Sequence, residues 1–197
     1  MQKTIQYIRE ELAPYYPETE ISGFIQMIMN SVLGMSYTQM ILEKDRVLET
    51  TESDGINVIV ERLKRHEPIQ YILGVAEFYG LQLNVKPGVL IPRPETEELV
   101  EWISKTEIPE QARILDVGTG SGCIAIALKK NLDDALVFGI DISKEALSTA
   151  GKNAFINEVM VRFLQLDILD PHPYPDFKEL DLIVSNPPYI TQSEKAA

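Results

Sequence analysis

Apolar residues in the first part of the chain recur every three or four positions, which is the spacing of one face of an α-helix. Four segments share this spacing: residues 5–12, residues 19–33, a short segment after Ser36, and residues 53–66. Pro14 and Pro68 interrupt the pattern, because proline cannot continue a helix. The pattern therefore predicts a small α-helical bundle, and we place this domain at residues 1–74.

The pattern changes over residues 75–90. Apolar and polar residues partly alternate from residue 77 to residue 85, with Gly80 in the middle, which is typical of a short β-hairpin. We therefore predict a hairpin connector over residues 75–90. Pro94 follows soon after, and proline suits the first turn of a helix, so a helix over residues 95–105 is expected next.

Strands and helices alternate from residue 112 onward. Predicted strands cover residues 114–117, 136–140, 161–166 and 180–185, and predicted helices cover residues 121–130 and 143–156. Such alternation indicates a parallel sheet with right-handed crossovers, so the fold class is α/β and the domain covers residues 91–197. Ligands bind at the carboxyl ends of the strands in open sheets of this kind. The residues that follow each strand are therefore the candidate site.

Composition and charge narrow the classes of function. The chain has 197 residues, 45% of them hydrophobic, and a formal net charge of -12, which argues against a nucleic-acid binder. It has no apolar run of bilayer length, no signal-peptide core and a single cysteine, which together predict a cytoplasmic protein without a membrane partner. His66 and His172 show no ligand spacing, so no metal site is predicted. We expect a monomer.

A glycine-rich turn follows the first predicted strand. Residues 116–122 read Asp-Val-Gly-Thr-Gly-Ser-Gly, and glycines let the backbone turn tightly and approach a ligand closely. The Gly-x-Gly-x-Gly spacing differs from that of dinucleotide-binding turns. The carboxylate before it would repel a pyrophosphate and attract the ammonium group of a methionine moiety. The candidate cofactor residues of this turn are Asp116, Gly118, Thr119, Gly120 and Gly122.

Acidic residues follow the second and third predicted strands. Asp141 can accept hydrogen bonds from both hydroxyls of a ribose, and Asp167 can accept one from the amino group of adenine. Enzymes that use NAD also carry an acid after strand two. Asp141 therefore indicates an adenosine cofactor without deciding which one.

The fourth predicted strand is followed by Asn186, Pro187, Pro188 and Tyr189. The side-chain oxygen of Asn186 and the carbonyl of Pro187 can accept both hydrogens of a planar NH2 group, because the following proline restricts the backbone. Tyr189 can stack on a flat amide or base. Catalysis at such a weakly nucleophilic nitrogen would come from orientation and charge placement.

In combination, these motifs resemble class I (Rossmann-like) methyltransferases that act on planar NH2 nitrogens. Two further strings, residues 70–80 (QYILGVAEFYG) and residues 90–97 (LIPRPETE), are similar to the HemK/PrmC family. The resemblance implies transfer of a methyl group from S-adenosylmethionine to N5 of the glutamine in the Gly-Gly-Gln loop of peptide chain release factors. The helical domain would help to hold the release factor.

The resemblance also implies roles for residues. The glycines would line the cofactor, with Asp116 near its amino-acid end, Asp141 at the ribose and Asp167 near adenine. Asn186, Pro187, Pro188 and Tyr189 would bind the substrate amide. Asn186, Pro187 and Tyr189 would be the catalytic residues, and Asn186 would also contact the cofactor. Arg93, Glu95 and Thr96 would lie near the reacting centre.

One departure and three alternatives accompany this reading. A complete sheet of this class needs three more strands after residue 197, so the methyltransferase domain is expected to be C-terminally incomplete. An adenine-N6 methyltransferase acting on DNA or RNA could use a similar tetrapeptide. A non-catalytic module that binds release factors is the second alternative. An NAD-dependent oxidoreductase is disfavoured by Asp116 and by the Asn-Pro-Pro-Tyr string.

Overall fold

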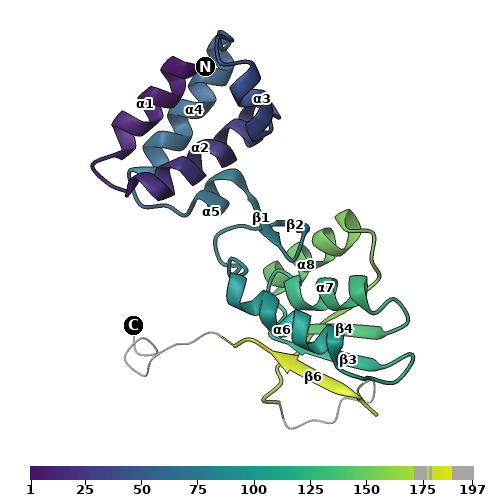
Figure 1. Cartoon of the computed structure of the whole chain (residues 1–197). Coiled ribbons are helices and arrows are strands. Elements are labelled where there is room, and N and C mark those ends of the chain that lie inside the picture. The colour runs from purple at the N-terminus through teal and green to yellow at the C-terminus, as the bar shows by residue number, and fades with distance from the viewer. Residues whose placement is uncertain (171–176, 178, 188–197) are drawn as a thin grey trace. The chain divides into compact units, whose positions relative to one another are not determined.

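The computed structural model describes residues 1–170, 177 and 179–187. The chain divides into two compact units, Met1–Gly74 and Val75–Ala197 (Figure 1). The first unit is helical and the second contains both sheets, so the change of hydrophobic pattern at residue 75 coincides with the division.

The first unit contains all four helices that the apolar spacing predicts. These four helices are α1 (Gln2–Leu12), α2 (Glu18–Leu33), α3 (Tyr37–Leu42) and α4 (Thr50–Leu63). A short additional helix, α5 (Ile69–Leu73), follows them. Helix α4 starts three residues before its predicted start, because the Glu52 carboxylate accepts a hydrogen bond from the Glu49 amide at 2.8 Å and caps the first turn. It ends at Leu63, and His66 adopts a left-handed φ of 58°.

The interior of the first unit is apolar. Ile8, Leu12, Ile28, Ile56 and Leu63 each expose no surface to solvent. Full burial of such a side chain stabilises a fold by about 1.5–3 kcal/mol. These residues come from α1, α2 and α4, so the three long helices are held together mainly by this shared core.

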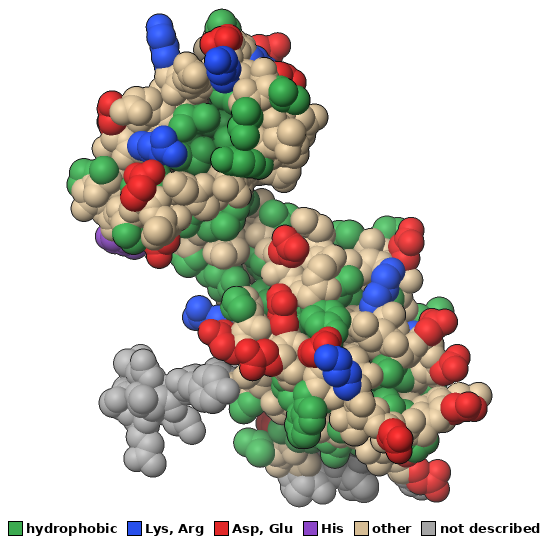
Figure 2. All heavy atoms as spheres, viewed as in Figure 1, with side chains coloured by type: hydrophobic (Ala, Val, Ile, Leu, Met, Phe, Trp, Pro, Cys, Tyr) green, Lys and Arg blue, Asp and Glu red, His purple; other side chains and the backbone are tan. Residues whose placement is uncertain are grey.

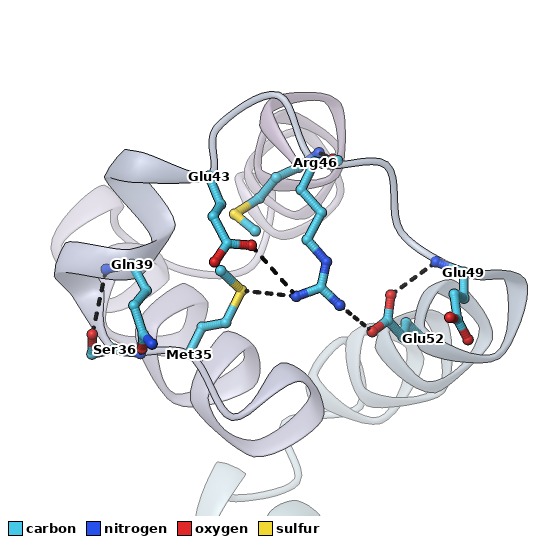
Figure 3. Close-up of polar contacts among 8 residues, drawn as sticks. Met35, Ser36, Gln39, Glu43, Arg46, Glu49 and Glu52 are labelled. Carbon is cyan, nitrogen blue, oxygen red and sulfur yellow. Dashed lines mark hydrogen bonds and ion pairs between the residues drawn. The ribbon is translucent and has the colours of Figure 1, made fainter.

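Polar interactions of the first unit surround that core. Arg46, in the loop between α3 and α4, donates to Glu52 at 2.7 Å and to the Met35 sulfur at 3.5 Å, and it lies 3.8 Å from Glu43 (Figure 3). This guanidinium group therefore ties the loop to α4 through Glu52 and to the residues on either side of α3 through Met35 and Glu43.

The second unit begins with a β-hairpin. Strands β1 (Val75–Phe78) and β2 (Leu81–Asn84) pair antiparallel, with Phe78 opposite Leu81. Tyr79 and Gly80 have φ values of 50° and 72°, as a tight type I′ turn requires. Alternate residues of both strands are buried, and Phe78, Leu81 and Leu83 belong to the main core of the second unit.

A four-stranded parallel sheet forms the centre of the second unit. Its elements are α6 (Pro94–Lys105), β3 (Arg113–Val117), α7 (Cys123–Asn131), β4 (Leu136–Asp141), α8 (Lys144–Ile156), β5 (Arg162–Gln165) and β6 (Leu182–Ser185). The strand order is β5-β4-β3-β6. The predicted α/β alternation is confirmed. Helix α7 begins at Cys123, two residues after its predicted start, because Gly122 caps it with a left-handed φ of 81°.

Helices α6, α7 and α8 cover one face of this sheet. Helix α7 contacts both α6 and α8 and packs on β3 and β4, while α8 also packs on β2 of the hairpin (Figure 1). The opposite face carries a smaller cluster around Leu115, Phe138 and Ile140. None of the helices in the described ranges combines the length and the apolar character needed to cross a membrane.

Candidate functional site

The turn between β3 and α7 is built on left-handed glycines. Gly118, Gly120 and Gly122 have φ values of 71°, 57° and 81°, which side chains rarely tolerate. The amides of Gly118 and Thr119 both donate to the Ile140 carbonyl at 2.9 Å, so the turn is fixed to the end of β4. The sequence folds this way because each of these three glycines supplies a conformation that the tight turn requires.

Asp116 lies beneath this turn and is 1% exposed. The Thr119 hydroxyl donates to its Oδ2 at 2.6 Å. Burial, and then the nearby Asp141 charge, raise the pKa of Asp116 to about 6, although the Thr119 hydroxyl and the Ala125 amide act in the opposite direction. Desolvation and the Asp116 charge also raise the pKa of Cys123 to about 12, so this cysteine is a protonated thiol at neutral pH.

The absence of a side chain at Gly139 on β4 leaves room for the hydrogen bond between Thr119 and Asp116. A Cβ atom at that position would lie 2.7 Å from the Phe163 ring and 2.9 Å from Thr119 Oγ1. Both distances are shorter than van der Waals contact, so any side chain at residue 139 would displace the Thr119 hydroxyl from Asp116.

Asp141, at the end of β4, is held by two backbone amides. Its Oδ2 accepts from Gly120 N and its Oδ1 accepts from Ser143 N, both at 2.9 Å. These bonds orient the carboxylate and attach it to the glycine turn. Each carboxylate oxygen can accept more than one hydrogen bond, so a hydroxyl-bearing ligand can still bind there.

The end of β3 lies beside the end of β6. The two strands are parallel neighbours in which Val117 is opposite Ser185, and the Ser185 hydroxyl donates to the Val117 carbonyl at 2.8 Å. The next residues along the two strands are Gly118 and Asn186. The strand order reverses direction between β3 and β6, and such switch points are where open parallel sheets bind ligands.

A cavity of about 420 Å³ opens at these strand ends. Residues from the ends of all four strands line it, together with three residues that follow the hairpin. Its polar and glycine lining includes Gly118, Gly120, Asp141, Asp167 and Asn186, and Pro187 also lines it. Apolar walls come mainly from Val89, Ile142, Leu166, Ile168 and Leu169.

Asn186 is oriented by a residue of α6. Its Nδ2 donates to Thr96 Oγ1 at 2.9 Å, and Thr96 is 6% exposed. Because this bond uses the amino end of the side chain, the carbonyl oxygen Oδ1 is the end that can accept a hydrogen bond from a ligand.

The structure brings some predicted site residues together and separates others. Asp116 and Thr119 are buried beneath the turn, and Gly122 starts α7 against α8; none of the three lines the cavity. Arg93 and Glu95 are exposed at the start of α6 and do not line it. The predicted substrate residues Pro188 and Tyr189 lie outside the described residues.

Some residues of the cavity carry no sequence signal. Gly88, Val89 and Leu90 line it from the segment that follows the hairpin, which the sequence pattern indicates only as part of a connector. No local pattern in the sequence indicates that this segment lines the same cavity as the glycine-rich turn.

Proteins of a known family are similar to this chain over nearly its whole length. A family model named PrmC N-terminal domain matches residues 3–74, and one named Methyltransferase small domain matches residues 94–197. A release factor glutamine methyltransferase of Bacteroides thetaiotaomicron is 45% identical over 195 residues, which cover 99% of this chain and 69% of that protein. The chain belongs to the release factor glutamine methyltransferase family. The resemblance and the fold class predicted from the motifs are thereby confirmed.

A second member of the family, from Flavobacterium psychrophilum, is 44% identical over 190 residues, which cover 94% of this chain and 66% of that protein. The chain thus spans about two thirds of the length of these relatives. Among solved structures, the 16S rRNA N2 G1207 methyltransferase of T. thermophilus, in complex with AdoMet and guanosine, is similar with a TM-score of 0.48 and 23% identity. That similarity covers 60% of this chain and 33% of the other.

Proposed function

We propose that this protein transfers a methyl group from S-adenosylmethionine to the side-chain amide nitrogen of a glutamine in a peptide chain release factor, in the cytoplasm. The single observation that carries the proposal is that Asn186 and the glycine turn line one cavity. The proposal is supported by the pairing of β3 with β6, because the residues that follow these two strands, Gly118 and Asn186, line the same cavity.

The cavity suits the proposed cofactor. Asp141 offers a carboxylate, already oriented by two amides, for the ribose hydroxyls. Apolar side chains such as Ile142, Leu166 and Ile168 suit a flat adenine ring beside the exposed Asp167. Asp116, beneath the turn, favours a ligand with a positive charge nearby. When bound, S-adenosylmethionine supplies an electrophilic methyl group.

The substrate amide is a poor nucleophile, because its nitrogen lone pair is delocalised into the carbonyl group. Asn186 Oδ1 and the Pro187 carbonyl would accept its two N–H groups and fix the orientation of the nitrogen. Two acceptors also stabilise the positive charge that develops on that nitrogen. Orientation within a closed site is then the main source of rate, and no strong base is needed at this position.

Thr96 has a supporting role in this scheme. Its hydroxyl accepts from Asn186 Nδ2, so the asparagine presents its oxygen, and not its amino group, to the substrate. An amide presented the other way round would place a donor against the donors of the substrate. Thr96 is therefore proposed as a residue that orients Asn186 without touching the reacting nitrogen.

Labelled methyl transfer tests the proposal. The protein is incubated with methyl-labelled cofactor and purified release factor, and mass spectrometry locates the label. Label on a single glutamine is the expected result. Label on adenine of an added DNA or RNA would contradict the proposal in favour of a nucleic-acid methyltransferase. Cofactor binding without any transfer would favour a module that only binds.

The variant Asn186→Ala tests the role of the cavity. We expect turnover to fall by about 100-fold, because the reacting nitrogen loses its orientation. The dissociation constant of S-adenosylhomocysteine, measured by calorimetry, should change little. Thr96→Val should show a weaker form of the same pattern and Thr96→Ser should restore activity. Unchanged turnover in Asn186→Ala would remove the proposed role.

A further inference from the structure

Asn153 on α8 is a polar side chain with no exposed surface and a complete set of partners. Its Oδ1 accepts from the Asn84 amide at 2.7 Å. Its Nδ2 donates to the Asn84 carbonyl at 3.0 Å and to the Ser121 carbonyl at 2.9 Å. One side chain thus joins the last residue of the hairpin to the glycine-rich turn, from positions 69 and 32 residues away in sequence.

The chemistry of these partners fixes the orientation of the Asn153 amide. Two of its neighbours are carbonyl oxygens, which only accept, and the third is an N–H group, which only donates. Turning the amide over would place its oxygen against two carbonyls. The three bonds can therefore form together in one orientation only, and only with an amide of this length.

Close packing of α8 against the turn brings Asn153 within reach. A Cβ atom at Gly122 would lie 3.0 Å from Ala150 Cβ and 3.0 Å from Ile126 Cδ1. Ala150 lies almost one helical turn before Asn153 on α8, so the absence of a side chain at Gly122 allows the helix to approach Ser121. Gly122 therefore contributes to this contact as well as to the turn itself.

The two segments that Asn153 joins lead into two separate parts of the chain that line the cavity. Ser121 belongs to the turn whose Gly118 and Gly120 line the cavity. Asn84 leads, within a few residues, into Gly88, Val89 and Leu90, which line it from the other segment. Val85 and Val89 are 4% and 2% exposed, so this segment is held against the core.

We infer that Asn153 is a positioning residue for the cofactor cavity: its amide holds the glycine turn and the segment after the hairpin at a fixed separation, so that the cavity exists before the cofactor binds. The inference rests on the proposed function only in naming the ligand. Preformed sites bind more tightly because less ordering is needed on binding.

The test compares Asn153, on α8, with Asn157, the residue that follows the last residue of that helix. Asn157 also joins α8 to the hairpin, with Nδ2 donating to the Gln82 carbonyl at 2.9 Å, but it does not reach the glycine turn. Asn153→Asp keeps the size and removes both donated bonds; Asn157→Asp makes the same change at the other asparagine and is the matched control. We expect about tenfold weaker binding of S-adenosylhomocysteine in Asn153→Asp and less than twofold in Asn157→Asp.

Amide hydrogen exchange separates positioning from general stability. In Asn153→Asp, the amides of residues 118–122 and of residues 85–90 should both exchange faster, while those of the hairpin turn at Tyr79 stay unchanged. Equal effects of the two variants on affinity and exchange would overturn the inference. If Asn153→Asp does not fold, Asn153→Ser removes the same donors without adding a charge and is judged by the same comparison.

The outcomes for the two proposals are distinguishable. If the unsubstituted protein binds no S-adenosylhomocysteine, the proposed function fails. The exchange measurement still decides whether Asn153 holds the two cavity walls together, because it needs no ligand. If the cofactor binds and exchange at the two walls is independent of Asn153, the positioning role fails alone.

Discussion

The two units of the chain place their polar groups differently. In the part of the chain that the structure describes, every buried polar side chain belongs to the second unit: Thr96, Asp116, Thr119, Ser121, Thr149 and Asn153. The first unit buries only apolar side chains, and most of the ion pairs of the described residues lie on its surface. On the face shown in Figure 2, acidic side chains are spread over both units, and basic ones are scattered among them.

This difference separates residues that stabilise from residues that position. Burying a polar group costs free energy unless it is hydrogen-bonded, so such groups are kept where they fix a geometry. The side chains of Thr96, Asp116, Thr119 and Asn153 form hydrogen bonds around the cavity or its glycine turn, and Thr149 bonds within α8. The described residues of the first unit bury no polar side chain of this kind.

Leu63→Ala should have the largest effect on stability. Leu63 has no exposed surface and lies at the end of α4 in the core of the first unit. Such truncations cost about 2–5 kcal/mol, because a cavity replaces the lost contacts. Urea unfolding followed by hydrogen exchange of residues 1–74 measures the change. Cofactor affinity should not change, and a parallel loss of it would show that the two units are not independent.

Asp116→Asn should raise the free energy of unfolding, whereas Leu63→Ala should lower it. Since the pKa of Asp116 is raised from 3.8 to about 6 in the folded protein, the folded state binds the extra proton and its stability falls as the pH rises through this range. Above pH 6 the buried charge costs about 3 kcal/mol. The free energy of unfolding of Asp116→Asn should therefore exceed that of the unsubstituted protein by most of this amount at neutral pH, and the two should be equal below about pH 4. Unfolding in urea at a series of pH values measures it; a difference independent of pH would contradict the burial argument.

Asp141→Ala should mainly weaken cofactor binding. Loss of hydrogen bonds to a charged group costs about 1.5–3 kcal/mol, which corresponds to about 10–150-fold in the dissociation constant. The variant also frees the amides of Gly120 and Ser143, so the glycine turn should exchange its amide hydrogens faster. Calorimetry with S-adenosylhomocysteine measures the affinity, and an unchanged value would remove the ribose assignment.

Glu67→Gln should have the smallest effect. Its hydrogen bond with Arg62 lowers the pKa of Glu67 below its usual value of 4.5, so the pair contributes above that pH and the contribution is lost as the pH falls through the lower value. Pairs as exposed as this one are screened by water and salt. The melting temperature at neutral pH should change much less than in Leu63→Ala. A comparable loss would mean that surface charges, and not the apolar core, hold the first unit.

The sequence predicted the elements well because each carries a local signal. Helices of the first unit follow apolar spacing, and the hairpin turn follows Gly80. The helix over residues 95–105 was expected from Pro94 and begins at Pro94 itself. Boundaries moved where a cap decided them, as at Glu52 and Gly122, because capping depends on side-chain geometry that spacing does not encode.

The site was predicted only in part. Residues that follow strands could be found, because the carboxyl ends of parallel strands meet at one edge. Asp141 and Asn186 line the cavity accordingly, and their roles stay predictions. Asn153 was missed, because its role depends on partners 32 and 69 residues away that no local pattern connects. Thr96 was expected near the reacting centre, but its contact with Asn186 joins residues 90 positions apart.

The strand order has a consequence for when each part of the sheet can form during synthesis. Strands β3, β4 and β5 and the acids that follow them come from one continuous stretch, whereas β6 returns to the far side of β3 from 68 residues later. Pairing across such a separation is slow, and it can begin only after the residues of β6 have been synthesised. A nascent chain can therefore pair β3, β4 and β5 early, and the cavity gains the part of its lining that contains Asn186 only when β6 joins the sheet.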